Sequence, residues 1–282
     1  SLGLFNRANV NIDFYHKKTT NILMSVPQSY AVTGEGNRWE NIGAMMNRGI
    51  EVAIDGDIIR MNDFTWNLSA NFSYNKNKLL ELYNGVEVGH SVTEYFLNRY
   101  AGVNPANGDA LWYTADGELT TEFREDDKVM TGKTYESPWA GGFGTTFIWK
   151  GISLSAQFSW MAKRYVMNND RFFEESNGIY STYNQSKRLL YNRWKKPGDI
   201  TDIPRYDVPA QLDDRFLENT SFLRLKNLTV AYSLPQSLLK KSNFFAAARV
   251  YLQGQNLLTW TGFTGLDPEV ATNVYRAQYP AS

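Results

Sequence analysis

Cysteine is absent from this chain of 282 residues, and histidine is nearly so, with only His16 and His90. Without thiols the chain forms no disulfide, no thiolate zinc site and no cysteine nucleophile. Two histidines far apart in the sequence exclude a histidine metal cluster and leave few ways to build a Ser-His-Asp triad. We therefore expect no catalytic residue, no metal site and no cofactor, and we predict that the chain is not an enzyme.

Net charge is absent as well, since 29 basic side chains balance 29 acidic ones. A neutral chain has no electrostatic attraction for nucleic acid, so we expect no nucleic-acid partner. Long apolar runs are also missing, because no window holds the roughly 18 uninterrupted apolar residues that a membrane helix needs. Helical membrane proteins are therefore excluded. The first residues, SLGL, lack the charged start and apolar stretch of a signal peptide.

Strict alternation of apolar and polar residues is what the sequence has in abundance. In TWNLSANFSYN (65–75) every second residue is apolar, and the residues between them are Asn or Ser. This period of two is typical of a β-strand whose two faces meet different surroundings. In residues 221–235 the apolar phase slips by one residue at Lys226-Asn227, which predicts a β-bulge. Segments with the same alternation are 8–18, 48–57, 141–165, 221–235 and 248–260.

The connections between these strands alternate between short and long. Tight turns are expected at Phe5–Arg7, Met61–Asp63 and Lys150-Gly151. The links that separate them, 23–46, 80–140 and 166–220, are far longer than the few residues usual in compact domains. Short turns on one side of a sheet and long loops on the other are the layout of an outer-membrane barrel.

Alternation alone is equally compatible with a soluble β-sandwich, in which Trp66, Phe72 and Trp160 would face a packed core. In a membrane barrel the same row faces lipid, and the Asn/Ser row faces a wet lumen. The strand lengths agree with the barrel. Trp66 to Tyr74 spans ~26 Å at ~3.3 Å per residue, and a tilt of ~40° gives a height of ~20 Å, close to the ~25 Å apolar band of such barrels. The loop asymmetry and this length favour the barrel.

The C-terminal third, with SFLRLKNLTVAYSLP (221–235) and RVYLQGQNLLTWTGFTGLDPEV (249–270), resembles the end of SusC/RagA-type TonB-dependent transporters. The most specific pieces are the Gln255-Asn256-Leu257 and Asp267-Pro268-Glu269 motifs at their characteristic spacing. Earlier segments resemble the same family in the same order, so that the resemblance covers nearly the whole chain: DFYHKKTTNIL (13–23), NIGAMMNRGIEVAI (41–54), YAGVNPANGDALWY (100–113) and RWKKPGDITDIPRY (193–206).

The resemblance implies a 22-stranded antiparallel transmembrane β-barrel with an N-terminal plug, in the outer membrane of a Gram-negative bacterium. Nothing in the sequence resembles a plug or a TonB box, and it stops at YPAS, where the family continues into a last strand. We therefore expect an all-β segment of about seven to eight strands with short periplasmic turns and long extracellular loops. Residues 1–282 would be the C-terminal part of the transporter's barrel domain, without the plug domain and the last strand.

The function implied is TonB-dependent import of oligomeric nutrients, either glycan or peptide fragments. The implied partners are a SusD-like surface lipoprotein, the TonB complex through the absent N-terminal region, an oligosaccharide or peptide ligand, and outer-membrane lipid. The alternatives are a soluble secreted glycan-binding β-sandwich protein and a glycan-cleaving enzyme, which needs paired carboxylates. The loop 166–220 is the predicted contact with the lipoprotein. Aromatic residues expected in the outer loops are the candidate solute contacts: Trp39, Trp112, Tyr113 and Trp139.

Overall fold

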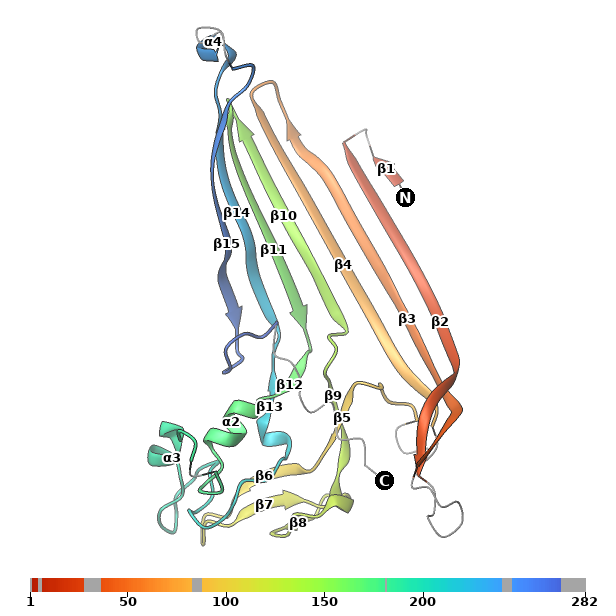
Figure 1. The fold of residues 1–282 in the computed structure, drawn as a ribbon, viewed down its shortest axis with the longest axis vertical. Coiled ribbons are helices and arrows are strands. Elements are labelled where there is room, and N and C mark those ends of the chain that lie inside the picture. Colours follow the sequence, from red (N-terminus) through yellow and green to blue (C-terminus); the bar gives the residue numbers. More distant parts are fainter. Residues whose placement is uncertain are drawn as a thin grey trace.

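A long antiparallel sheet dominates the computed structural model, which describes residues 2–4, 7–27, 37–82, 88–180, 182–239 and 245–269 (Figure 1). Its eight strands follow the order β1-β2-β3-β4-β10-β11-β14-β15. The strands are β1 (Leu2–Leu4), β2 (Ala8–Pro27), β3 (Asn37–Arg60), β4 (Phe64–Glu81), β10 (Trp139–Trp149), β11 (Ile152–Ala162), β14 (Phe222–Ser233) and β15 (Arg249–Thr261). Because β1 and β15 are unpaired edges among the described residues, the sheet is an open wall. The expected seven to eight strands are confirmed.

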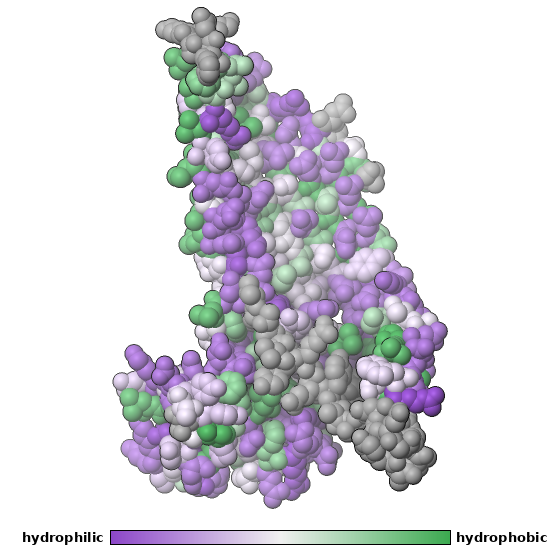
Figure 2. Space-filling model, in the orientation of Figure 1, coloured by the Kyte–Doolittle hydropathy of each residue, from purple (hydrophilic) through white to green (hydrophobic). Residues whose placement is uncertain are grey.

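The pairing register puts the apolar residues of neighbouring strands on one face of this wall. Phe143 lies opposite Ala70 on β4 and Phe158 on β11, whereas Gly142 between these rows lies opposite Asn71 and Ser159. The apolar face is exposed: Phe14 on β2 is 78% exposed and Leu252 on β15 is also 78% exposed. Hydrophilic and hydrophobic side chains both reach the surface along the wall in Figure 2.

No second sheet of the described residues packs against the wall. The remaining sheets have two or three strands each and lie beyond one end of it (Figure 1). The β-sandwich alternative is therefore wrong. No helix of the described residues is long and apolar enough to span a membrane.

Two of the predicted tight turns are confirmed. Lys150 and Gly151 join β10 to β11 with φ angles of 46° and 86°, and positive φ at both central residues defines the I′ hairpin turn. Residues 61–63 join β3 to β4, where the Met61 N–H donates to the Phe64 carbonyl at 2.8 Å. Phe5 and Asn6, in the third predicted turn, lie outside the described residues.

The predicted strict alternation of short and long connections is wrong for the connection between β14 and β15. Residues 234–248 link β14 to β15 at the end of the wall that carries the short turns, and they include the helix α4 (Gln236–Leu239) (Figure 1). The predicted strands at 221–235 and 248–260 already leave residues 236–247 between them, which is too many for a tight turn. The predicted bulge is confirmed, because the register of β14 skips Lys226 against both neighbouring strands.

The long links differ from the sequence prediction in their bounds. Residues 23–27 and 37–46 continue β2 and β3, so Trp39 lies on a strand rather than in a loop. The link from β4 to β10 contains β5 (Glu94–Leu97), β6 (Arg99–Val103), β7 (Ala110–Tyr113), β8 (Leu119–Thr120), η1 (Glu125–Asp127) and β9 (Val129–Thr134). The link from β11 to β14 contains β12 (Tyr165–Met167), α2 (Asn169–Glu174), α3 (Lys187–Tyr191), η2 (Asp214–Phe216) and β13 (Leu217–Asn219).

These two links pack together into one folded body, which we call the loop unit (residues 88–138 and 163–221, without residue 181). Its apolar core combines residues of both links: Tyr95, Leu97, Met167, Ala210, Phe216 and Leu217. Phe216 is completely buried, and its ring meets that of Phe172 edge-on with centroids 5.4 Å apart. This buried apolar cluster thus lies at the end of the wall and not on its face.

Replacing Phe216 by alanine leaves a cavity in this core, and we expect the loop unit to lose about 3–5 kcal/mol of stability. Hydrogen exchange measured by mass spectrometry should rise in the loop unit and stay unchanged in the wall strands. Leu190→Ala, at a position that is 61% exposed in the same link, is the matched control. Equal exchange in the two variants would contradict the assignment of this core.

Candidate functional site

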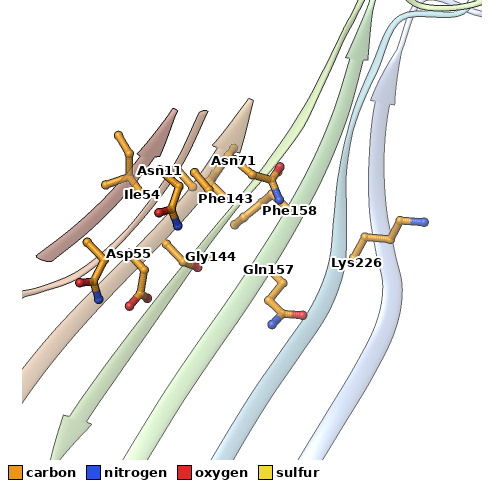
Figure 3. Close-up of a pocket in the computed structure, with 14 residues that line it drawn as sticks. Asn11, Ile54, Asp55, Asn71, Phe143, Gly144, Gln157, Phe158 and Lys226 are labelled. Carbon is orange, nitrogen blue, oxygen red and sulfur yellow. The ribbon is translucent and has the colours of Figure 1, made fainter. Parts of the chain in front are cut away.

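The face of the wall opposite the apolar rows is polar and hollowed. Two glycines of β10, Gly142 and Gly144, lie at inner-face positions of the register and carry no side chain there, whereas the neighbouring strands do. A Cβ added to Gly144 would lie 2.9 Å from Ser69 Oγ, and one added to Gly142 would lie 2.8 Å from the Phe158 carbonyl oxygen. The resulting hollow has a volume of about 440 Å³ (Figure 3).

Amides and hydroxyls surround this hollow, and they donate and accept hydrogen bonds without a fixed charge. Asn9 and Asn11 approach from β2, Asn71 from β4 and Gln157 from β11. These are the Asn, Ser and Gln rows that the alternation predicts for a wet face. Such a surface suits the hydroxyl groups of a sugar as well as the amide groups of a peptide.

Charged residues flank the amides on both sides. Asp55 of β3 and Lys226 of β14 line the same hollow from opposite ends (Figure 3). On the β2–β3 side, Asp13 lies opposite Glu51 on the inner face. The alternation of 8–18 and 48–57 in the sequence already predicts that these acids lie on the inner face. The inner face is therefore acidic near β3 and basic at β14.

The basic side of the inner face binds the Asp267-Pro268-Glu269 motif. Arg224 contacts Asp267 at 2.6 Å and Glu269 at 2.8 Å, and Lys226 contacts Glu269 at 2.7 Å. Arg164 donates to the Pro268 carbonyl at 2.6 Å. The side chain of Arg224 is only 6% exposed, so these charge-assisted bonds are well shielded from water. They hold the segment that follows β15 against the wall, a role that the motif alone does not predict.

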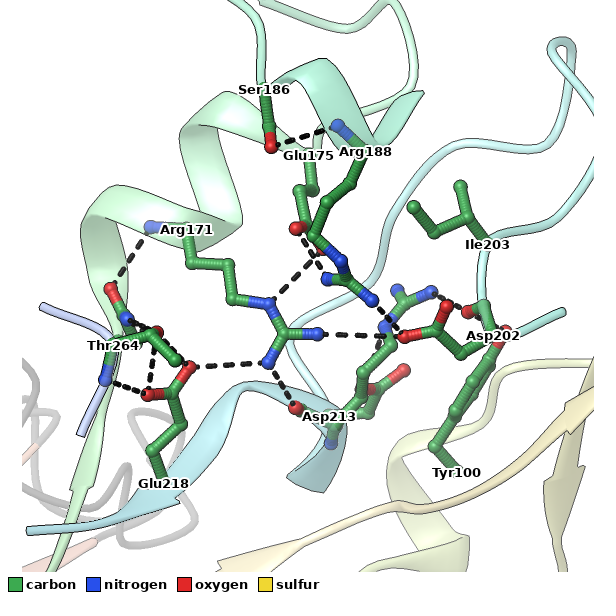
Figure 4. Close-up of polar contacts among 12 residues, drawn as sticks. Tyr100, Arg171, Glu175, Ser186, Arg188, Asp202, Ile203, Asp213, Glu218 and Thr264 are labelled. Atoms are coloured by element: carbon green, nitrogen blue, oxygen red, sulfur yellow. Dashed lines mark hydrogen bonds and ion pairs between the residues drawn. The ribbon is translucent and has the colours of Figure 1, made fainter. Parts of the chain in front are cut away.

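A network of ion pairs organises the loop unit next to this segment (Figure 4). Arg171 of α2 contacts Glu175 at 3.1 Å, Glu218 at 3.2 Å and Asp202 at 3.8 Å. Arg188 of α3 contacts Glu175 and Asp202. Partial burial, the largest single effect, raises the pKa of the Glu218 carboxyl. Hydrogen bonds from Thr264, Arg171 and Asn168 together outweigh burial, so that the pKa lies below its usual value. The network joins α2, α3 and β13 to the segment after β15.

A buried carboxyl joins the two links of the loop unit. Asp213 is fully buried and accepts a hydrogen bond of 2.8 Å from the indole N–H of Trp112. Burial raises the pKa of Asp213 to about 6, while Arg215 opposes the shift. The Arg215 guanidinium in turn lies 4.3 Å from the centroid of the Tyr100 ring. Contacts between residues far apart in sequence, such as 112 and 213, have no signal in the sequence pattern.

The four candidate solute contacts are distributed over three strands, and none of them lines the hollow at Gly144. Trp112 is only 4% exposed and packs on Asp213, whereas Tyr113, the next residue of β7, is 37% exposed beside Arg99. Trp39 is 66% exposed on β3. Trp139 begins β10, so it is not a loop residue, and its ring lies 4.2 Å from that of Tyr74. Contact of these residues with a solute stays a prediction.

An antiparallel wall with an exposed apolar outer face, a polar inner face and large loops at one end defines a segment of an outer-membrane type of β-barrel. The chain belongs to the family "TonB dependent receptor-like, beta-barrel", whose model matches residues 2–257. This is a family of receptors and transporters rather than of enzymes, and the expected resemblance is confirmed.

Relatives and solved structures support this membership. The RagAB peptide transporter structure aligns with a TM-score of 0.85 and 36% identity, over 94% of this chain and 31% of that chain. TonB-dependent receptor SusC of Bacteroides thetaiotaomicron is 27% identical, over 99% of this chain and 29% of SusC. TonB-dependent receptor P3 of Formosa agariphila is 28% identical, over 94% of this chain and 29% of P3. The chain thus spans about a third of the length of the proteins that it matches.

The raised pKa of Asp213 predicts how the stability of the loop unit changes with pH. The folded state holds the proton of the Asp213 carboxyl more tightly than the unfolded state does. The stability that this proton contributes is therefore complete below pH 3.8 and is lost as the pH rises through about 6. We expect the free energy of opening to fall by about 3 kcal/mol through this group. The opening free energy of the loop unit, measured by hydrogen exchange between pH 4 and 7, should depend less on pH in Asp213→Asn. Asp126→Asn, an exposed carboxylate of the same unit, should keep the wild-type slope.

Proposed function

We propose that this chain forms part of the barrel wall of an outer-membrane, TonB-dependent importer of oligomeric nutrients. The observation that carries the proposal is the pairing of an exposed apolar face with a polar face hollowed at Gly142 and Gly144. Such a sheet is stable when lipid covers one face and water fills the other. Membership of the TonB-dependent receptor family supports the same conclusion. The barrel would cross the outer membrane of a Gram-negative bacterium many times.

The nutrient is proposed to be a glycan or peptide fragment. The matched proteins include SusC and the RagAB peptide transporter. On the inner face, Asn71 and Gln157 offer hydrogen bonds to hydroxyl or amide groups. Asp55 adds a negative charge at one end of the hollow, whereas the charge of Lys226 at the other end is paired with Glu269.

The mechanism proposed is capture of the solute between the extracellular loops and a SusD-like surface lipoprotein, followed by TonB-driven release into the periplasm. The plug and the contact with TonB would be provided by a region N-terminal to these residues. The exposed rings of Trp39 and Tyr113 are the proposed solute contacts on the loop side. Trp112 would act indirectly, because its packing on Asp213 shapes the surface next to it, whereas Trp139 packs on Tyr74 of the outer face.

Filling the hollow should impair transport without disturbing the outer face. In the full-length protein, Gly142→Leu with Gly144→Leu adds two side chains to the inner wall, and we expect uptake of labelled oligopeptides to fall about tenfold or more. The control is Ala156→Leu, which adds the same kind of side chain to the outer face of β11. Heat-modifiable migration of the detergent-extracted protein checks that each barrel is folded. Normal uptake by a folded Gly142→Leu, Gly144→Leu variant would contradict the proposed solute path.

The loop 166–220 is the proposed contact with the surface lipoprotein, as its exposed apolar residues indicate. Ile200 is 93% exposed, Tyr191 is 72% exposed and Tyr206 is 66% exposed. Large apolar side chains that are exposed in the free protein often become the centre of an interface. They lie in the part of the loop unit that includes α3.

Ile200→Asp combined with Tyr191→Ser should weaken binding of the lipoprotein to the full-length transporter by about tenfold or more. Affinity would be measured by surface plasmon resonance with detergent-solubilised transporter. Leu119→Ser, at a position that is 60% exposed in the other link, is the control and should bind normally. Unchanged affinity in the double variant would exclude this loop as the contact.

A further inference from the structure

Five basic residues gather on the outer face of β2, β3 and β4. His16 lies opposite Arg48, and Arg48 lies opposite Lys76 on the next strand. One row further along, Lys18 lies opposite Met46, and Met46 lies opposite Lys78. We call these five residues the basic patch: His16, Lys18, Arg48, Lys76 and Lys78.

The register assigns the patch to the outer face. Phe14, Ile50 and Tyr74 form one cross-strand row of the apolar face. Each basic residue of the first row is two positions away from a member of this apolar row on the same strand. Because side chains alternate between faces, residues two apart share a face. The patch therefore continues the apolar row on the same side of the wall.

The charges of the patch are not compensated within the described part of the chain. None of its members forms an ion pair with a described carboxylate. Asp13 and Glu51, the nearest acids in the sequence of β2 and β3, occupy the alternate positions and face inward. Like charges directly opposite each other across strands are destabilising, so a patch of this kind gains stability when an anion covers it.

An apolar hollow begins directly at the patch. Phe14 and Ile50 line it together with Tyr74, and His16, Arg48 and Lys76 close its polar end, around a volume of about 630 Å³. Phe14 is 78% exposed, which leaves a large ring surface open to an apolar ligand. The site thus presents cations at one end and apolar surface at the other.

The position of the patch along the strands places it near the membrane boundary on the side of the long loops. The Tyr74 ring packs on Trp139, 4.2 Å away, in the aromatic row on the side of the long loops. Tyr and Trp rows of this kind mark the boundary between the hydrocarbon and the headgroups. The patch lies one row beyond this boundary, at the level of lipid headgroups, and its long side chains can extend into that region.

We propose that the basic patch binds the phosphate-bearing headgroup of an outer-leaflet lipid with net negative charge, with an acyl chain of that lipid against Phe14 and Ile50. The proposal rests on the outer-membrane location given under the proposed function and adds a lipid site to it. The guanidinium of Arg48 matches a phosphate in a bidentate geometry, and the flanking Lys76 adds a point charge. The site has its cations at the headgroup level and its apolar surface toward the hydrocarbon, an arrangement that fits an amphiphile better than a free anion.

The test uses the purified full-length transporter in dodecyl maltoside micelles doped with phosphatidylglycerol or phosphatidylcholine. Native mass spectrometry counts the lipids that each variant retains. We expect preferential retention of phosphatidylglycerol, about fivefold weaker in Arg48→Gln and about 25-fold weaker in Arg48→Gln with Lys76→Gln. The matched control is Lys17→Gln, which removes one charge from the other face of β2 and should retain phosphatidylglycerol normally.

Three results would overturn the proposal. The first is equal retention of the two lipids by the wild type, and the second is full retention by the double variant. The third is displacement of phosphatidylglycerol by millimolar inorganic phosphate, which would indicate a site for a free anion. Outer-membrane fractionation and the uptake assay are read separately in the same variants. A lost lipid site with normal location and uptake therefore remains distinguishable from failure of the proposed function.

Discussion

Everything in this structure depends on the hydrogen-bonded ladder of the antiparallel wall and on the two different surroundings of its faces. The ladder satisfies the backbone polar groups between neighbouring strands, which a chain in hydrocarbon must do internally. The side-chain alternation then separates an apolar row such as Phe143 and Phe158 from an inner row such as Asn71 and Gln157. One register error would exchange the two rows, so the register of the strands is also the specification of the inner surface.

The wall provides a rigid frame, and the buried apolar cluster around Phe216 lies in the loop unit beyond its end. Two links far apart in sequence meet there through Trp112 and Asp213, and ion pairs of Arg171 extend the contact to β13. Arg224 then fixes the segment after β15 to the inner face. The loop unit is thereby held to the end of the wall by charge-assisted bonds, while the wall itself depends on its ladder and on the lipid that we propose at its outer face. The two parts are stabilised by different forces.

The sequence predicts the wall well, because its information is local. The period of two along 65–75, the turn at Lys150-Gly151 and the phase slip at Lys226 each specify one strand, one hairpin and one bulge. The candidate site is predicted only in part. The polar inner row follows from alternation, but the hollow arises because Gly142 and Gly144 face inward between larger neighbours. The burial of Trp112 depends on Asp213, more than a hundred residues later, and no local pattern contains it.

The central claim is that one face of this wall meets lipid and the other meets water. Single cysteines carrying a nitroxide label at Gln157 and Phe158, in a full-length transporter otherwise free of cysteine and reconstituted in lipid vesicles, test it directly. The account predicts that the label at 158 collides mainly with oxygen, which concentrates in the membrane. The label at 157 should collide mainly with a water-soluble nickel chelate. Equal access of the chelate to both labels, or protection of both from the two reagents, would contradict the account.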